Sequence, residues 1–533
     1  MIRTLTTLSL AAVALCACKP TERTALKKIQ QEEQPAAPAE PAAKPESPAP
    51  DAVAAVPSPA PETEPAPQPD ATPQNPSHSL LLVSATLQDY NPLQPWKKES
   101  PQQSRALGVY MGEGRVLTIG RVVHSATYVE LILPDASRTV PARVLRYDED
   151  MNLALLTVAH EEDASIFESR TALPLGDALN RGDKATFAAL INGVEPLHVE
   201  LQAENAGGDK IPLMVMRAAR PLPEGQTNGA PVVRDGKLNA LGVAYKKQEH
   251  LMQVVNAELI QRFLTQEKPG VPILGVELTP LDDPQFRQYL KLDSSANGLY
   301  ISKVLPGSAA ETAGVKAGDV LTAIDGLSLD NQGRCDHPRY GLHHATVLLR
   351  GMKDIGQELP LNISRKGESL QISVNLNRDA MDNALFKPQQ PGKQPRYIVW
   401  GGLLFQPLTG TLLSEFRNMN NGVLPLELQT LEQNEAELRA AQFTEPVGLT
   451  FVLPTVATQG YDELRFCQLL AVNGTQVKNF ADLPALLDTA TENGLIRLDF
   501  NKAPYTIYME RATVEAVNEQ LQQHAVPQLR VVE

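Results

Sequence analysis

The sequence has little of what a nucleic-acid-binding surface requires. Aromatic residues make up 5% of the 533, and 62 acidic residues outnumber 48 basic ones, for a formal net charge of −14. Nucleic-acid binders usually present a basic face, and single-stranded ligands stack on aromatic rings. We therefore expect no nucleic-acid partner. A chain of this length predicts roughly two to four domains.

Cysteine is also scarce, with four in the whole chain. No Cys-x-x-Cys pair and no zinc-ligand spacing occurs. Cys335 and Cys467 fall in different predicted domains, so two free buried thiols are expected, with a disulfide as the alternative. Cys335, His337, His343 and His344 lie within ten residues, but adjacent histidines on one helix or strand point apart. We expect no metal and no cofactor.

Long apolar runs are absent, so no transmembrane helix is predicted. Residues 5–17 form an apolar segment too short to span a bilayer, behind Arg3. The segment ends Leu15-Cys16-Ala17-Cys18, which resembles the lipobox of bacterial lipoprotein signal peptides. The resemblance implies a signal peptide over residues 1–18, lipidation of Cys18 and anchoring to a bacterial envelope membrane, on its periplasmic face. The alternative is an ordinary cleaved secretory signal, and both predict export.

Residues 19–78 are rich in proline, alanine and glutamate and predict a disordered linker. From residue 79 to 269, short apolar stretches alternate with Gly, Pro and Asp turns, which is typical of a β-barrel or sandwich. The period of residues 256–266 predicts a helix that closes this domain. The expected strands are 109–111, 115–119, 129–133, 140–146, 153–158, 185–190, 199–203, 213–216 and 238–244.

Two further units follow, at 270–380 and 395–512, before a C-terminal helix and tail at 513–533. Residues 298–326 run strand, turn, short Ala-rich helix and strand, and closely resemble a PDZ domain. The resemblance implies that a loop at Leu274, Gly275 and Val276 binds a peptide carboxylate while the peptide adds a strand beside the following residues. Strand and turn signals at 469–475 suggest a second, more divergent PDZ domain, with an unrelated α+β domain as the alternative. The expected peptide-binding residues are Leu274, Gly275, Val276, Glu277 and Leu278, with Gly401, Gly402 and Leu403 in a second loop.

A barrel followed by two PDZ-like units resembles the Deg/HtrA family of trypsin-like serine proteases, over about residues 107–511. The expected fold is mainly β, a chymotrypsin-like double β-barrel followed by two PDZ-like α+β domains. The family needs a histidine base, an aspartate that orients it and a serine nucleophile. The matching positions here hold Arg121, Asn152 and Asn228, so the triad is degenerate.

None of these three residues can take the role of the one it replaces. A guanidinium stays protonated near neutral pH, and an amide cannot stabilise an imidazolium as a carboxylate does. His124, Asp150 and Thr227 are nearby substitutes, but each needs a shifted register or a base.

The sequence therefore predicts an exported, lipid-anchored pseudoprotease that binds peptides or protein C-termini through its PDZ units. Its role would be that of an adaptor, a chaperone-like protein or a regulator of an active protease. The family also implies a homo-oligomer, such as a trimer. The alternatives are an active endopeptidase with a rearranged site and a structural envelope scaffold.

Overall fold

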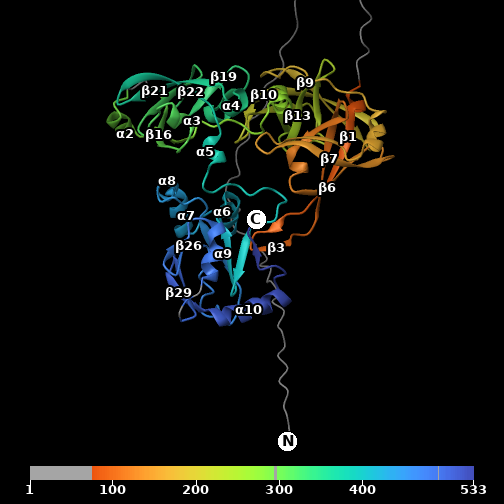
Figure 1. Cartoon of the computed structure of the whole chain (residues 1–533). Coiled ribbons are helices and arrows are strands. Elements are labelled where there is room, and N and C mark those ends of the chain that lie inside the picture. Colours follow the sequence, from red (N-terminus) through yellow and green to blue (C-terminus); the bar gives the residue numbers. More distant parts are fainter. Residues whose placement is uncertain (1–74, 293–296, 490, 492) are drawn as a thin grey trace, which may run out of the picture. The chain divides into compact units, whose positions relative to one another are not determined.

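The computed structural model describes residues 75–292, 297–489, 491 and 493–533. The predicted signal peptide, Cys18 and nearly all of the predicted linker lie outside this part of the chain. The described part starts with a short 3-10 helix, η1 (Pro76–Ser79), capped by Asn75, which accepts the Ser77 N–H at 3.1 Å. The fold is mainly β, as predicted, and two six-stranded barrels come first (Figure 1).

The first barrel is closed in the strand order β1-β4-β5-β8-β7-β6. Apolar side chains of all six strands fill its interior, and Leu80, Val109 and Leu117 are completely buried there. The predicted strand 153–158 is observed with those bounds. The strands are β1 (Leu80–Leu87), β4 (Gln102–Gly112), β5 (Arg115–Ile119), β6 (Ala126–Ile132), β7 (Thr139–Asp148) and β8 (Leu153–Val158).

The second barrel repeats this closure in the order β10-β11-β14-β13-β12-β9. The predicted helix 256–266 is observed as α1 (Ala257–Thr265), with Asn256 and Gln266 as its caps. Asn256 also accepts the Leu179 N–H at 2.8 Å, which ties the helix start to the loop before β9. The strands are β9 (Lys184–Ile191), β10 (Glu195–Gly207), β11 (Leu213–Ala218), β12 (Pro231–Arg234), β13 (Lys237–Lys246) and β14 (Leu251–Asn256).

The first PDZ unit is one antiparallel sheet in the order β15-β16-β17-β21-β22, with β18 paired to β17. Its longest helix, α4, has a buried apolar side that packs on the sheet. The strands are β15 (Val276–Pro280), β16 (Leu299–Val304), β17 (Val320–Ile324), β18 (Leu327–Ser328), β21 (Glu358–Arg365) and β22 (Glu368–Asn375). The helices are α2 (Pro284–Tyr289), α3 (Ala309–Thr312), α4 (Ala345–Met352) and, after the sheet, α5 (Asp379–Asp382).

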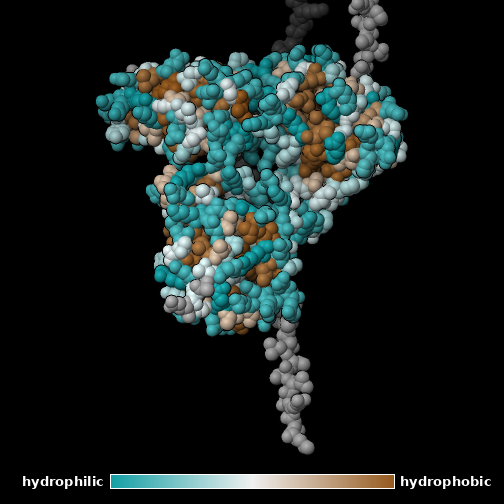
Figure 2. Space-filling view, viewed as in Figure 1, coloured by the Kyte–Doolittle hydropathy of each residue, from teal (hydrophilic) through white to brown (hydrophobic). Residues whose placement is uncertain are grey.

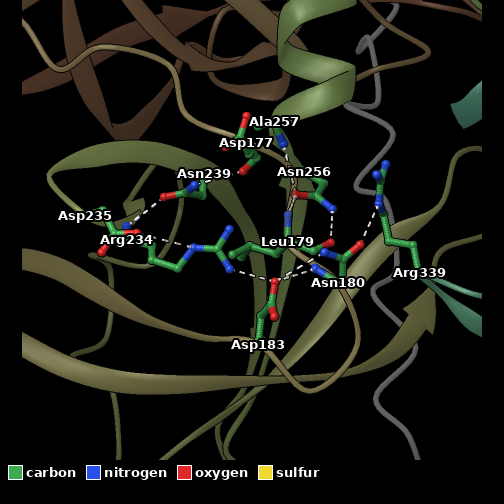
Figure 3. A network of polar contacts seen from close by, with 10 residues as sticks. All are labelled: Asp177, Leu179, Asn180, Asp183, Arg234, Asp235, Asn239, Asn256, Ala257 and Arg339. Carbon is green, nitrogen blue, oxygen red and sulfur yellow. Dashed lines mark hydrogen bonds and ion pairs between the residues drawn. The ribbon is translucent and has the colours of Figure 1, made fainter.

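A hairpin inserted in this unit, β19 (Arg334–His337) and β20 (Gly341–His344), contacts the second barrel. At its tip the Tyr340 hydroxyl bonds Glu258 of α1, and its ring is fully buried. Arg339 pairs with the same carboxylate and donates to Asn180 at 3.2 Å (Figure 3). Tyr340 therefore belongs to a hydrophobic core shared by the second barrel and the first PDZ unit.

Figure 3 shows that Asp183 and Arg234 stabilise the loop around Asn180, which Arg339 contacts. Asp183 accepts the Asn180 N–H at 2.9 Å and pairs with Arg234 at 2.6 Å. The bond from Asn180 and the pairing with Arg234 hold the pKa of Asp183 below its usual value. This loop presents a polar, preorganised surface to the inserted hairpin.

The third unit contains a longer sheet, in the order β29-β28-β26-β25-β24-β23-β30, with β27 paired to β26. The strands are β23 (Tyr397–Trp400), β24 (Leu403–Pro407), β25 (Val447–Val452), β26 (Cys467–Val472), β27 (Thr475–Gln476), β28 (Leu495–Phe500), β29 (Thr506–Glu510) and β30 (Arg530–Val531). The helices are α6 (Gly410–Met419), α7 (Leu426–Gln433), α8 (Glu435–Ala440), α9 (Leu483–Asp488) and α10 (Arg511–His524).

Two distant segments join this third unit. The hairpin β2 (Tyr90–Asn91) and β3 (Gln94–Lys98) lies between β1 and β4 in sequence, within the stretch that the sequence assigns to the barrel. Yet Trp96 packs on Tyr397 with ring centroids 5.7 Å apart, and Gln406 donates to the Pro92 carbonyl at 2.9 Å. The predicted C-terminal tail likewise supplies β30, which pairs with β23.

The surface is mostly hydrophilic, with apolar patches over the barrels and over the third unit (Figure 2). Within the described residues, no helix has the length and hydropathy needed to cross a bilayer. Cys335 and Cys467 are free and buried, as expected, and burial raises the pKa of their thiols to about 11 and about 12.

Candidate functional sites

Three turns of the barrels bring Arg121, Asn152 and Asn228 together. Arg121 lies in the 3-10 turn η2 (Gly120–Val122) after β5, and Asn152 directly precedes β8. Asn228 lies in the loop before β12. Arg121 donates its N–H to the Asn152 side chain at 2.8 Å, and its guanidinium lies 3.4 Å from Asn228 Oδ1. Residues 107 positions apart therefore meet at one place.

Local backbone geometry positions the two asparagines. Asn152 has φ of 52°, a left-handed conformation that asparagine tolerates better than most residues. Gly229, next to Asn228, has φ of 73°, and a Cβ there would lie 2.0 Å from the Leu107 carbonyl oxygen. The Asn228 carbonyl accepts the Leu107 N–H at 2.8 Å. The loop is thus held against β4 by glycine and by backbone bonding.

The side chains of Arg121, Asn152 and Asn228 are a guanidinium and two amides, which neither abstract a proton nor attack a carbonyl near neutral pH. Arg121 holds a permanent positive charge where a proton acceptor would be needed. The Asn152 and Asn228 side chains are neutral amides, which neither orient an imidazolium electrostatically nor attack a carbonyl. The Gln226 N–H donates to the Pro223 carbonyl at 3.5 Å and closes a turn within the loop before β12. Thr227 is buried, and no described histidine or carboxylate bonds its hydroxyl.

The neighbouring titratable residues have other partners. His124 Nδ1 lies 2.8 Å from the Tyr147 hydroxyl, whose pKa is raised by burial. Asp150 pairs with Arg378 at 2.6 Å. His124 and Asp150 line a cavity of about 490 Å³, and Arg121 and Asn152 also contribute to its lining. In the described part of the chain, no hydrogen bond joins His124 to a carboxylate.

A second site is the groove between β15 and α4 in the first PDZ unit. It has a volume of about 640 Å³. One wall contains Leu274, Gly275, Val276 and Leu278, which are expected site residues. The helix supplies Thr346, Leu349 and Arg350. Because β15 pairs only with β16 among the described strands, its outer edge can accept another strand.

The loop before β15 turns its N–H groups away from the body of the domain. The Leu274 and Gly275 carbonyls accept bonds from Ala310 at 3.1 Å and from Leu305 at 2.8 Å. The C=O and N–H of a trans peptide point in opposite directions, so the Gly275 and Val276 N–H groups point away from that segment. The Leu274 and Gly275 N–H groups donate to no acceptor among the described residues. They are available to an anionic ligand.

Gly275 is required by this geometry. Its φ is 79°, and a Cβ would lie 2.2 Å from the Ser308 Cβ. Glu277, the remaining expected residue of this loop, pairs with Lys303 at 3.3 Å. That pair lies on β15 and β16 and does not line the groove. At the helix end, burial lowers the pKa of His344, which lies 2.8 Å from the Thr346 hydroxyl.

The second glycine loop differs from the expectation of another peptide-binding loop. Gly401 and Gly402 form the tight turn between β23 and β24. The Gly401 N–H already donates to Asn518 at 2.8 Å, and the two glycine carbonyls accept from Thr455 and Leu453. Leu403 is fully buried. The Gly401 N–H is therefore not free to bind a peptide carboxylate. In addition, the chain's own β23 pairs along this side of β24.

The cysteine–histidine cluster of the inserted hairpin is satisfied internally. His337 Nδ1 accepts the Arg339 N–H at 3.1 Å, and His343 Nδ1 accepts the His344 N–H at 2.6 Å. Cys335 lies opposite His343 across the hairpin and is buried. These contacts hold the hairpin together.

Comparison with known proteins identifies PDZ domains in two parts of the chain. Family models of the PDZ domain match residues 264–336 and 386–531. Protease Do-like 2, chloroplastic, of Arabidopsis thaliana is 26% identical over 455 residues, 82% of this chain and 71% of that protein. The periplasmic serine endoprotease DegP of Escherichia coli is 22% identical over 292 residues, 51% of this chain and 56% of DegP.

The chain is a homologue of the Deg/HtrA proteases and contains two PDZ domains. A solved structure of the HtrA-type protease AlgW with a decapeptide aligns with 57% of this Deg/HtrA homologue and 96% of AlgW, at 19% identity and a TM-score of 0.40. Both relatives are proteases by name, DegP a serine endoprotease, and this Deg/HtrA homologue carries two PDZ domains.

Sequence reasoning missed two features of the sites. The pairing of β23 with β24 was one of them, because the apolar run 397–400 predicts a strand but does not indicate which strand it pairs with. The role of Trp96 was also missed. A tryptophan among polar residues at 94–98 was the available signal, since an isolated large ring usually seeks a packing partner.

Proposed function

We propose that this Deg/HtrA homologue is an exported, lipid-anchored and catalytically inactive protein that binds protein C-termini in the groove of its first PDZ unit. It would present bound chains to a partner, as an adaptor, or hold them, as a chaperone does. The observation that carries the proposal is the pair of Leu274 and Gly275 N–H groups, which have no acceptor among the described residues, beside the edge of β15 that no described strand covers. Two N–H donors match the two oxygens of a terminal carboxylate.

Export and anchoring rest on the first 18 residues. The motif ending in Cys18 favours a lipid anchor, and the long proline-rich segment behind it would act as a tether. The relative DegP is a periplasmic protein by name, which supports export. Metabolic labelling with a radioactive fatty acid should label the wild-type chain and not the Cys18→Ser variant.

Catalytic inactivity is supported by the chemistry of Arg121, Asn152 and Asn228, which meet without a nucleophile or a base. Purified protein is expected neither to cleave casein nor to react with a fluorophosphonate probe. Labelling of the wild-type chain by the probe would refute inactivity while leaving the peptide-binding proposal intact.

Peptide binding is best tested with a change in the ligand. Two fluorescein-labelled decapeptides, identical except for a free carboxylate or a C-terminal amide on an apolar last residue, are titrated by fluorescence anisotropy. Amidation should weaken binding by about tenfold or more, because the charge-assisted bonds to the loop are lost. Equal affinity of the two peptides would refute carboxylate recognition.

A matched pair of variants locates the site. Thr346→Trp places a large ring in the groove from α4 and should abolish binding of the free peptide. Thr171→Trp adds the same ring at an exposed position in the segment between β8 and β9 and should leave binding unchanged. Binding that survives in Thr346→Trp would place the peptide elsewhere.

A further inference from the structure

The third unit contains a separate groove of about 580 Å³. Its walls are α7, α8 and the segment that joins β28 to β29. Gln468, on β26 beneath α7, and Asn501 form part of its lining. Because the groove lies away from the Gly401–Gly402 turn and uses other elements, it is independent of the PDZ carboxylate loop.

A buried donor without an acceptor lies in this lining. Gln468 is only 3% exposed, and its Nε2 has no hydrogen-bond partner among the described residues. Its backbone groups are both taken by Asn501, with the N–H donating at 2.8 Å and the carbonyl accepting at 3.2 Å. The Asn501 side-chain NH₂ group also has a partner, because it donates to the Glu427 backbone carbonyl at 3.3 Å. A buried amide left unpaired is costly, so an incoming acceptor would be bound favourably.

The charged side chains that line the groove are all acidic. Glu427 and Glu437 line it, no lysine, arginine or histidine does, and neither carboxylate forms an ion pair among the described residues. The nearby acidic residues Glu432 and Glu435 are paired with Arg417 and Arg439. The groove therefore offers negative charge to a positively charged ligand.

Apolar surface borders these carboxylates. Leu426 is 72% exposed and Tyr505 is 62% exposed, and both line the groove. An inorganic cation would use the carboxylates but not the apolar rim or the Gln468 donor. A polypeptide segment offers all three complements, namely a backbone carbonyl, a cationic side chain and apolar stems.

We propose that this groove binds an extended segment of another polypeptide that carries lysine or arginine side chains. A backbone carbonyl of the segment accepts from Gln468 Nε2, the cationic side chains pair with Glu427 and Glu437, and the side-chain stems pack on Leu426 and Tyr505. The groove would then recognise internal basic segments, in addition to the C-termini that the first PDZ unit is proposed to bind.

The test uses a peptide that the first PDZ unit would not bind through its carboxylate loop. A labelled octapeptide of leucine, alanine and lysine, acetylated and amidated at its ends, is titrated into the full chain by fluorescence anisotropy. A peptide with glutamate at the lysine positions is the control. Binding of the basic peptide alone is expected, and it should weaken as salt is raised.

Variants then assign the site. Glu437→Gln removes one exposed carboxylate without changing its size and should weaken binding by about fivefold, and Glu427→Gln should do the same. Glu519→Gln, an exposed residue of α10 outside the groove, should leave affinity unchanged. Gln468→Leu should also weaken the binding of the basic peptide, with the variant's thermal unfolding recorded to confirm folding.

The proposal is overturned if the basic and acidic peptides bind alike, if neither binds, or if Glu519→Gln has the same effect as Glu437→Gln. A second copy of this chain is the other possible occupant. In that case sedimentation velocity would show a dimer that dissociates in Glu437→Lys, and the proposal of a basic partner would be wrong. Loss of C-terminal peptide binding alone would refute the proposed PDZ function and leave this groove unaffected.

Discussion

The two PDZ-like units share one order of strands and differ at one edge of the sheet. In the first, β15 follows the glycine loop and ends the sheet, and none of its residues is fully buried. In the third unit β24 follows the corresponding loop, but β23 and then β30 lie beyond it, and all five of its residues are buried. The same loop and strand therefore build an open groove in one unit and an interior strand in the other.

This difference shows that a glycine loop is not sufficient for peptide binding. A peptide binds a PDZ sheet by adding a strand, so the edge must be free. In the third unit the chain has added its own strand there, and its turn donates to Asn518. The following predictions test whether the open edge and the filled edge behave as different sites.

The largest effect is expected from Val399→Pro in β23. Val399 is almost fully buried and donates its N–H to the Leu529 carbonyl at 2.7 Å. Proline removes that bond and perturbs an interior strand, so the third unit should lose on the order of 3 kcal/mol of unfolding free energy, measured by urea denaturation. Peptide binding by the first unit should persist.

Tyr508→Pro in the edge strand β29 is the matched control. Its partner Arg497 uses both backbone groups toward Asn473, so the Tyr508 N–H faces away from β28. The control should cost much less than Val399→Pro. Equal effects would mean that β23 is not an integral part of the sheet.

The glycines of the two loops provide the second prediction. Gly275→Ala should weaken C-terminal peptide binding about tenfold, because its Cβ would overlap Ser308 and shift the loop. Gly402→Ala, whose Cβ would lie 2.8 Å from Thr455, should lower the stability of the third unit by about 1–2 kcal/mol without changing peptide affinity. Gly307→Ala has open space around its Cβ and serves as the backbone control. A loss of affinity in Gly402→Ala would show that the second glycine loop also contributes to peptide binding.

The third prediction concerns Trp96, which packs on Tyr397 of the filled edge. Trp96→Ala should destabilise the third unit by about 2 kcal/mol, because a half-buried aromatic contact is lost. Lys97→Ala, exposed on the same strand, should have no measurable effect. Thermal unfolding followed by circular dichroism would measure both. An unchanged midpoint in Trp96→Ala would show that the hairpin does not support the third unit.

The smallest effect is a dependence of stability on pH through His337, which helps to fix the open-edged unit to the barrel. Burial lowers the pKa of His337, and its Nδ1 accepts N–H bonds from Arg339 and Tyr340. The folded state therefore prefers the neutral ring. As pH falls through about 6.5 the unfolded chain takes up the proton first, so stability declines.

The midpoint of thermal unfolding should drop on going from pH 7.5 to pH 5.5, and His337→Gln should reduce that drop by roughly 1–2 °C. His198, exposed on the second barrel, gives the control variant His198→Gln. An identical pH dependence in all three proteins would exclude His337 as its source.

Much of the fold follows from local patterns. Alternating apolar residues mark which face of a strand is buried, and turn residues mark where it ends, so α1 and nine of the twelve barrel strands were located from the sequence. The strands β1, β12 and β14 were not predicted, and β4 begins seven residues before its predicted start. The sequence also predicts that Arg121, Asn152 and Asn228 lie at the triad positions, because each is beside a recognisable strand. The structure brings the three residues together, and their roles in a former triad stay a prediction.

Other features depend on pairing between segments far apart in the chain. The sequence around Gly401 resembles that around Gly275, but only the tertiary structure shows that β23 fills the adjacent edge and that Asn518 takes the Gly401 N–H. In the same way, Trp96 packs on Tyr397, about three hundred residues away, and the Gln468 side-chain amide, which lacks a partner among the described residues, is surrounded by segments tens of residues away. Local sequence determines which face of a strand is apolar. Whether an edge is free is decided by the strand that finally pairs with it, because every residue except proline offers the same backbone N–H and C=O groups.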